Sequence, residues 1–371
     1  MLKAGVFLGF LAMTMDLPMP PPRFGADGGP PQRMLLSWMP GEAQCDGRPV
    51  AHVMLRRPLG ELGFGPATQM PSISYTFEID AAGRPLSIAR DSKGNSGFSG
   101  EVAPALAASR FAAGARKNCR IAYSAEAKAL GEAALEDLAS YTMAPTSRRL
   151  PKEGWDRLKS AGNCFTAPFP QPLLRAFPDF DKLPGTPGVR DWSLVAYDTD
   201  GKGAPTGMKT LFGTGNKALD AAAKKAVGDS RFTGGARAGC RYPYWKAAET
   251  LAPPPAPTEQ SLRPQNSNCP AGSRWKRPLA TRFPEPWRRR AIEGWAIVTY
   301  DLAPWGGVGN AKVVAAQPAA DFGQAALTIV QNATAEPSPQ GATGCVETVR
   351  FTMGRRIDQE MVEEPGAMEI F

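Results

Sequence analysis

The sequence predicts an α+β fold of three tandem units, each ordered strand–strand–helix–strand, with a small antiparallel sheet and one helix. Three observations predict it. Six cysteines, taken as consecutive pairs, are separated by 74, 76 and 76 residues. The stretch SRFAAGARKNCR at 109–120 returns as SRFTGGARAGCR at 230–241. Each cysteine pair also encloses a β-rich hairpin pattern followed by an Ala-rich segment of helical character.

The composition allows several packed cores. The chain has 371 residues, of which 43% are hydrophobic, and this length suits two or three domains. The formal net charge is +8 and the isoelectric point is about 9.2. A basic surface of this kind is either simply solvated or faces an acidic partner. Charge is concentrated only at Arg288, Arg289 and Arg290.

Residues 1–24 predict an export signal or a short N-terminal hydrophobic segment. Lys3 precedes twelve apolar residues at 4–15. That length is typical of a secretory signal, whereas a membrane-spanning helix needs about 20 residues. We therefore expect a periplasmic protein, tethered to the inner membrane if the segment is not cleaved.

A hairpin pattern opens each unit. Two β-rich runs flank a turn rich in Gly and Pro, and the first run ends on Asp80, Asp198 or Asp301, which suits the entry to a turn. The predicted strands are 75–80 with 86–92, 192–198 with 207–213, and 294–301 with 311–318.

The Ala-rich segments 101–111, 216–232 and 320–336 predict the helices, and the second cysteine of each unit begins the last strand. Residues 125–143 predict a linker helix, and the Pro-rich residues 246–260 predict a semi-rigid spacer. The expected divisions are unit one at 33–125, a linker helix at 126–150, unit two at 151–246, a Pro-rich linker at 247–263, unit three at 264–353 and a tail at 354–371.

The cysteine spacing predicts one disulfide in each unit. No pair has the CxxC spacing of a zinc or redox site. Pairing within units is the only arrangement that reproduces the regular intervals, and disulfides imply an oxidising compartment. The predicted bonds are Cys45–Cys119, Cys164–Cys240 and Cys269–Cys345.

Unit three carries a family resemblance. Its sequence RFPEPWRRRAIEGWAIVTYDLAPWGGVGNAKVVAAQP at 282–318 resembles the C-terminal domain of TonB and of related energy transducers. Phe283-Pro284 replaces the Tyr-Pro that begins that domain, and Arg288, Arg289 and Arg290 stand in its basic helical turn. Unit two keeps an aromatic-Pro pair at Phe177-Pro178, and the resemblance weakens further in unit one. It implies three divergent TonB-C-like units, without the long anchor and extended spacer of an energy transducer.

Catalytic and cofactor sites are not expected. His52 is the sole histidine, and no GxSxG or HExxH motif occurs. The stretch DTDGKG at 198–203 resembles the start of a calcium loop, but position twelve is Lys209, so a hairpin turn is favoured. Export and disulfides argue against a nucleic-acid partner, although basic and aromatic residues mingle at 273–290. We expect no enzyme, no cofactor and no metal.

An exposed sheet edge is the predicted binding feature, because such an edge is either protected or takes up an extended partner strand. The first hypothesis is a periplasmic protein that binds an envelope protein, such as the N-terminal segment of an outer-membrane receptor, with a link to TonB-dependent transport. The alternative is a non-catalytic scaffold resting on cell-wall polymer. The oligomeric state stays open. The expected partner-binding residues are Phe283, Pro284, Arg288, Arg289, Arg290, Val346, Thr348, Val349 and Arg350.

Overall fold

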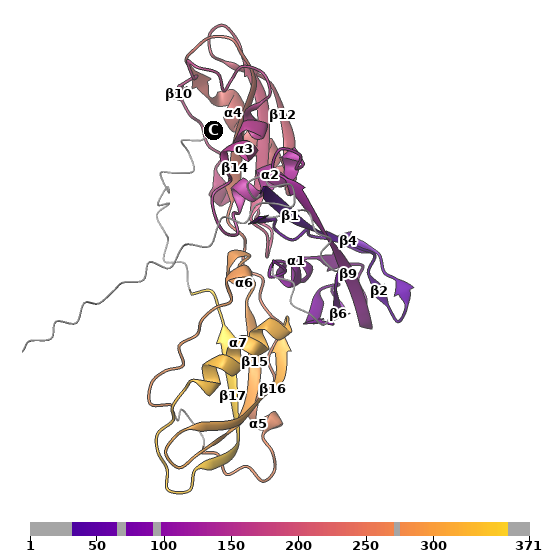
Figure 1. The fold of residues 1–371 in the computed structure, drawn as a ribbon, viewed down its shortest axis with the longest axis vertical. Coiled ribbons are helices and arrows are strands. Elements are labelled where there is room, and N and C mark those ends of the chain that lie inside the picture. Colours follow the sequence, from indigo (N-terminus) through magenta and orange to yellow (C-terminus); the bar gives the residue numbers. More distant parts are fainter. Residues whose placement is uncertain (1–31, 65–71, 92–97, 271–274, 355–371) are drawn as a thin grey trace, which may run out of the picture.

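The computed structural model describes residues 32–64, 72–91, 98–270 and 275–354, and its long axis runs from the second unit at one end to the third at the other (Figure 1). The predicted export segment at 1–24 and the tail from 355 onward lie outside the described residues. The elements of the first unit are β1 (Arg33–Pro40), β2 (Gln44–Cys45), β3 (Arg48–Pro49), β4 (His52–Met54), β5 (Glu61–Phe64), β6 (Ile73–Ile79), β7 (Pro85–Arg90), α1 (Val102–Ala107), β8 (Arg110–Phe111) and β9 (Arg116–Ala129).

The remaining elements differ in what precedes each hairpin but keep the order strand, strand, helix, strand from the hairpin onward. The linker and second unit hold α2 (Leu135–Met143), α3 (Lys152–Lys159), β10 (Pro172–Leu174), η1 (Phe180–Lys182), β11 (Asp191–Thr199), β12 (Pro205–Gly213), α4 (Lys217–Asp229), β13 (Arg231–Phe232) and β14 (Arg237–Lys246). The rest of the described chain holds α5 (Glu259–Leu262), α6 (Glu285–Arg289), β15 (Gly294–Leu302), β16 (Val308–Gln317), α7 (Ala320–Gln331) and β17 (Ala342–Phe351).

The same antiparallel arrangement occurs three times. The first strand of each hairpin is central, its hairpin partner lies on one side, and the last strand of the unit lies on the other. The orders are β7-β6-β9, β12-β11-β14 and β16-β15-β17. The fold is therefore α+β with small antiparallel sheets, as predicted.

One turn glycine ties each hairpin to the end of its helix. Gly83, Gly203 and Gly306 all have φ between +76° and +88°. Their carbonyl groups accept hydrogen bonds from the amides of Phe111, Phe232 and Ala335, respectively. A Cβ on any of these glycines would lie within 2.2 Å of a carbonyl oxygen, so only glycine fits.

The repeated Ser-Arg-Phe has a structural explanation. The hydroxyl groups of Ser109 and Ser230 donate to the carbonyl groups of Ala105 and Ala226 at the helix end. The same hydroxyl oxygens accept the amides of Arg56 and Ala176, at 2.9 and 3.0 Å. Each serine thus fastens the segment just after β4 or β10 to the end of the helix. In the third unit the corresponding contact is backbone only, from the Lys276 amide to the Thr334 carbonyl.

Asp80, Asp198 and Asp301 were expected at equivalent positions of their hairpins, and the structure corrects this expectation. Asp80 and Asp200 occupy the same turn position, where each Oδ1 accepts two backbone amides. Asp198 and Asp301 instead lie on the central strand and accept the amides of Gly239 and Gly344. The Asp200 contacts agree with the expected hairpin turn at 198–203.

All four predicted helices are shorter than expected, with α4 ending at Asp229 and α7 at Gln331 instead of at 232 and 336. In the first unit α1 covers only 102–107, because the chain turns at Ser109 to form β8. The predicted linker helix at 125–143 was wrong in its first part. Residues up to Ala129 continue β9 and pair with β1, with Met34 opposite Ala129, and only α2 is helical. The alternating burial along 122–129 is the strand pattern that the Ala-rich composition obscured.

The units are packed against one another rather than strung on linkers. One apolar core joins the first and third units through Ile88, Trp287 and Ile292. A second core joins α2 and α3 to Leu35 of the first unit and to Trp192 and Leu194 of the second. These contacts explain the burial pattern of the central strands. Strand β6 alternates between buried and exposed residues, whereas β11 and β15 are buried along most of their length because both faces are covered.

Candidate functional site: the outer edge of strand β17

The disulfide of each unit anchors the start of its last strand. The bonds join Cys45–Cys119, Cys164–Cys240 and Cys269–Cys345, with Cα–Cα distances of 3.9, 5.0 and 5.1 Å. This is the pairing that the spacing predicted. In the first unit the two cysteines lie directly opposite each other on β2 and β9. The chain segment before each sheet is thereby fixed to the last strand of that sheet.

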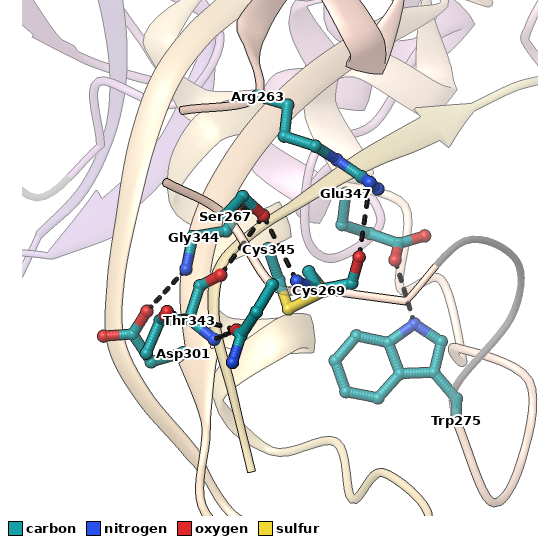
Figure 2. Close-up of a disulfide and its surroundings, with 10 residues drawn as sticks. Arg263, Ser267, Cys269, Trp275, Asp301, Thr343, Gly344, Cys345 and Glu347 are labelled. Atoms are coloured by element: carbon teal, nitrogen blue, oxygen red, sulfur yellow. Dashed lines mark hydrogen bonds between the residues drawn. A yellow bond between two sulfur atoms is a disulfide. The ribbon is translucent and has the colours of Figure 1, made fainter. Parts of the chain in front are cut away.

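Polar side chains complete this anchor in the third unit (Figure 2). The Asn268 Oδ1 accepts the Thr343 amide, and the Ser267 hydroxyl donates to the Gly344 carbonyl at 2.9 Å. The Asp301 carboxylate accepts the Gly344 amide at 2.8 Å from the other side. Asn163 makes the equivalent contact to the Ala238 amide in the second unit. The Asn-Cys dipeptide at 163–164 and 268–269 is a signal in the sequence that our sequence analysis missed.

The register of β17 shows which of its residues face the open side. Ala296 lies opposite Val349, and Ile297 lies opposite Thr348. The Thr348 amide donates away from β15, to the Glu259 carboxylate at 3.0 Å. Both backbone groups of a residue in an antiparallel strand point to the same side, so Val346 and Arg350 also point outward. Val349 points toward β15.

The three units close this same edge in three different ways. Counting three residues from the second cysteine gives Ala122, Pro243 and Thr348, which lie opposite Ser74, Leu194 and Ile297. The Ala122 carbonyl is occupied by the Gly41 amide at 2.8 Å, because β1 and β2 run along β9. Pro243 has no N–H to offer. Thr348 keeps its N–H and is covered only by a side chain, that of Glu259.

The Pro-rich segment before the third unit lies on the sheet, which corrects its predicted role as a simple spacer. The Trp295 indole N–H donates to the Pro254 carbonyl at 2.7 Å. Ala256 and Leu262 pack against a small apolar core made by Trp295, Ile297 and Val346. This contact face is the side of the sheet opposite α7, because the α7 residues Phe322, Ala326 and Val330 belong to the other core.

The predicted binding residues are divided by the structure. Val346 and Val349 are buried, Thr348 is half-buried and Arg350 is exposed. Phe283 is half-buried and packs edge-on against Phe322 and Phe351. Pro284 precedes α6, and its carbonyl accepts the Trp287 amide. Of this group Val346, Thr348 and Arg350 point backbone groups to the outer edge, and only Thr348 and Arg350 also carry polar side chains there.

The three arginines of the basic turn, which we expected to bind a partner, are not all exposed. Arg288 is exposed and pairs with Glu285. Arg289 donates to the Glu101 carboxylate of the first unit, and Arg290 lies 4.0 Å from the same carboxylate. Burial raises the pKa of Glu101, and the two guanidinium groups offset part of that effect. Burial also lowers the pKa of Arg290. Two of the three arginines are therefore used inside the chain.

The described residues contain no group of three or more His, Cys, Asp or Glu side chains that could hold a metal. His52 is exposed on β4. Within the same described ranges, no helix is both long and apolar enough to cross a membrane.

Comparison with known proteins finds a family match in the third unit. No curated protein matched the chain. The model of one family, Gram-negative bacterial TonB protein C-terminal, matches residues 280–353. That range covers α6, the β16-β15-β17 sheet and α7, which together form the last sheet-and-helix assembly described above. Residues 280–353 of this chain are therefore similar to the C-terminal domain of the TonB protein of Gram-negative bacteria.

Proposed function

We propose that this chain is a non-catalytic periplasmic protein that binds an extended segment of an envelope protein along the outer edge of β17. One observation carries the proposal. Of the three equivalent positions, Ala122 is covered by the chain between β1 and β2 and Pro243 lacks an N–H, whereas the Thr348 N–H points outward and meets a single side chain, that of Glu259. Strand addition needs such a donor, because it pairs main chain with main chain.

We further propose that the three units are divergent copies of one domain, with boundaries near 33–125, 151–246 and 264–353. The repeated sheet order, the hairpin glycine and the disulfide support this proposal. The edge is covered in the first copy and lacks a donor at Pro243 in the second, so these two copies serve mainly as packing partners. The N-terminal segment of an outer-membrane receptor is the partner we favour, which would link the chain to TonB-dependent transport.

Calorimetric titration of the full chain with synthetic receptor N-terminal segments tests the binding. Thr348→Pro removes the outward N–H, and we expect it to abolish binding. Thr348→Ala keeps that N–H, so its affinity should stay within about threefold of the parent. Circular dichroism checks that both variants are folded. Equal binding by the proline variant would exclude the β17 edge. Sedimentation with cell-wall polymer, in the absence of any peptide binding, would favour the scaffold alternative.

A further inference from the structure

A short segment of the chain occupies the surface that the proposed partner would use. Residues 254–262, which we name the strap, run from the Pro254 carbonyl to α5. One end is fixed by the Trp295 indole N–H, and the other by the Glu259 carboxylate on the Thr348 amide. Ala256, between these two points, and Leu262, three residues after Glu259, lie against the apolar patch of Trp295, Ile297 and Val346.

The strap covers the edge without forming a strand. In the first unit β1 and β2 pair with β9 over several residues, so removing them would cost a ladder of backbone bonds. The strap gives β17 one carboxylate–amide bond, and the residue that makes it is only half-buried. A cover of this kind can leave the sheet while the domain stays folded. Prolines at 254, 255 and 257 also stop the strap from pairing as a regular strand.

We propose that the strap is an intramolecular ligand that must leave β17 before a partner binds, and that the partner shares its chemistry. The shared chemistry is one acceptor for the Thr348 amide and one carbonyl for the Trp295 indole. The strap, which ends in the helical turn α5, supplies the first acceptor from the Glu259 side chain, whereas an added strand supplies it from its main chain. The choice of partner rests on the proposed function. The release of the strap does not, and it can be measured without any partner.

The first experiment measures residue-resolved amide exchange in the full chain. Glu259→Ala removes the acceptor, and a lost hydrogen bond to a charged group should speed exchange of the Thr348 amide by at least about tenfold. Glu259→Gln keeps a side-chain oxygen and should restore most of the protection. The control Glu336→Ala changes an exposed glutamate of the same domain and should have no effect. If the Thr348 amide exchanges at the same rate in Glu259→Ala as in the parent, the proposal that the strap covers this amide is wrong.

The second experiment uses the strap as a probe in trans. A labelled peptide with the sequence of residues 252–264, APPPAPTEQSLRP, is titrated into the full-length parent and into Glu259→Ala. We expect at least about tenfold tighter binding to the variant, because its own strap competes less. The same peptide with its glutamate changed to alanine should lose that advantage. Equal affinity for parent and variant, or no binding to either, would overturn the recognition part of the proposal.

The two proposals fail separately. One outcome is that exchange of the Thr348 amide accelerates in Glu259→Ala and the strap peptide binds, while no receptor segment binds this variant. That result supports the strap proposal and shows that the proposed partner is wrong. If receptor segments bind the parent and Glu259→Ala equally well while exchange is unchanged, the strap is wrong and the edge remains the binding site.

Discussion

Pro243 and Thr348 occupy the same place in their sheets, each three residues after a disulfide cysteine and opposite the corresponding residue of the central strand. The proline removes the outward N–H of the second unit, whereas the threonine keeps that of the third. Edge strands are commonly protected by proline in this way. One residue therefore decides whether the edge offers a backbone donor at this position.

Replacing this proline should open the second edge. We expect Pro243→Thr to increase self-association, because it restores an outward donor on an otherwise intact strand. Sedimentation velocity of parent and variant at equal concentration measures the effect. An unchanged distribution of species would show that other contacts, such as the Leu158 carbonyl held by Arg241, close this edge.

The ion cluster between the first and third units should be a main determinant of stability. Glu101→Ala leaves Arg290 buried without its partner, and such a loss costs about 3–5 kcal/mol. Chemical unfolding followed by circular dichroism measures it. Asp156→Ala, which removes the exposed partner of Lys152 on α3, is the control and should cost less than about 1 kcal/mol. Similar losses in the free energy of unfolding for both variants would contradict a stabilising role of Glu101 between the first and third units.

Stability should fall as the pH rises toward neutrality because of Glu61. Burial, with Glu101 nearby, raises its pKa to about 7 from an ordinary value of 4.5. The folded state therefore binds this proton more tightly than the unfolded state. Its contribution is fully present below about pH 4.5 and is lost as the pH rises through about 7.

The matched variant for this effect is Glu61→Gln, which cannot ionise. Because the side chain is only half-buried, we expect the parent to lose about 1 kcal/mol relative to the variant between pH 5 and pH 8. Urea unfolding at the two pH values gives the difference. Parallel pH profiles for parent and variant would show that Glu61 does not keep its proton in the fold.

The hairpin glycines should not tolerate a side chain. A Cβ at Gly203 would lie 1.8 Å from the Phe232 carbonyl oxygen, at a φ of +76°. We expect Gly203→Ala to lower the free energy of unfolding by about 3 kcal/mol. Gly201→Ala in the same turn meets nothing within 4 Å and should change it by less than about 0.5 kcal/mol. Thermal unfolding of both variants compares them, and a tolerated Gly203→Ala would mean that the turn can rearrange.

The sequence by itself determined the repeated part of this protein. Cysteine spacing predicted all three disulfides, because a bond within each unit is the simplest cause of regular intervals. Hairpin patterns and Ala-rich segments gave the strand–strand–helix–strand order, since alternation and helical spacing are local properties of the chain. The motif around Phe283-Pro284 and Gly294 identified the one domain that a family model also matches.

Only the tertiary structure decided how each edge and each charge is used. Residues 125–129 have a helix-like composition, yet β1 pairs with them and makes them a strand. Arg289 and Arg290 look like an exposed basic turn, but Glu101, far away in the chain, buries them at an interface. Glu259 lies in a segment that reads as a spacer, and nothing local indicates that it reaches Thr348. These outcomes depend on contacts between distant segments, whose free energies outweigh local preference and leave no periodic signal in the sequence.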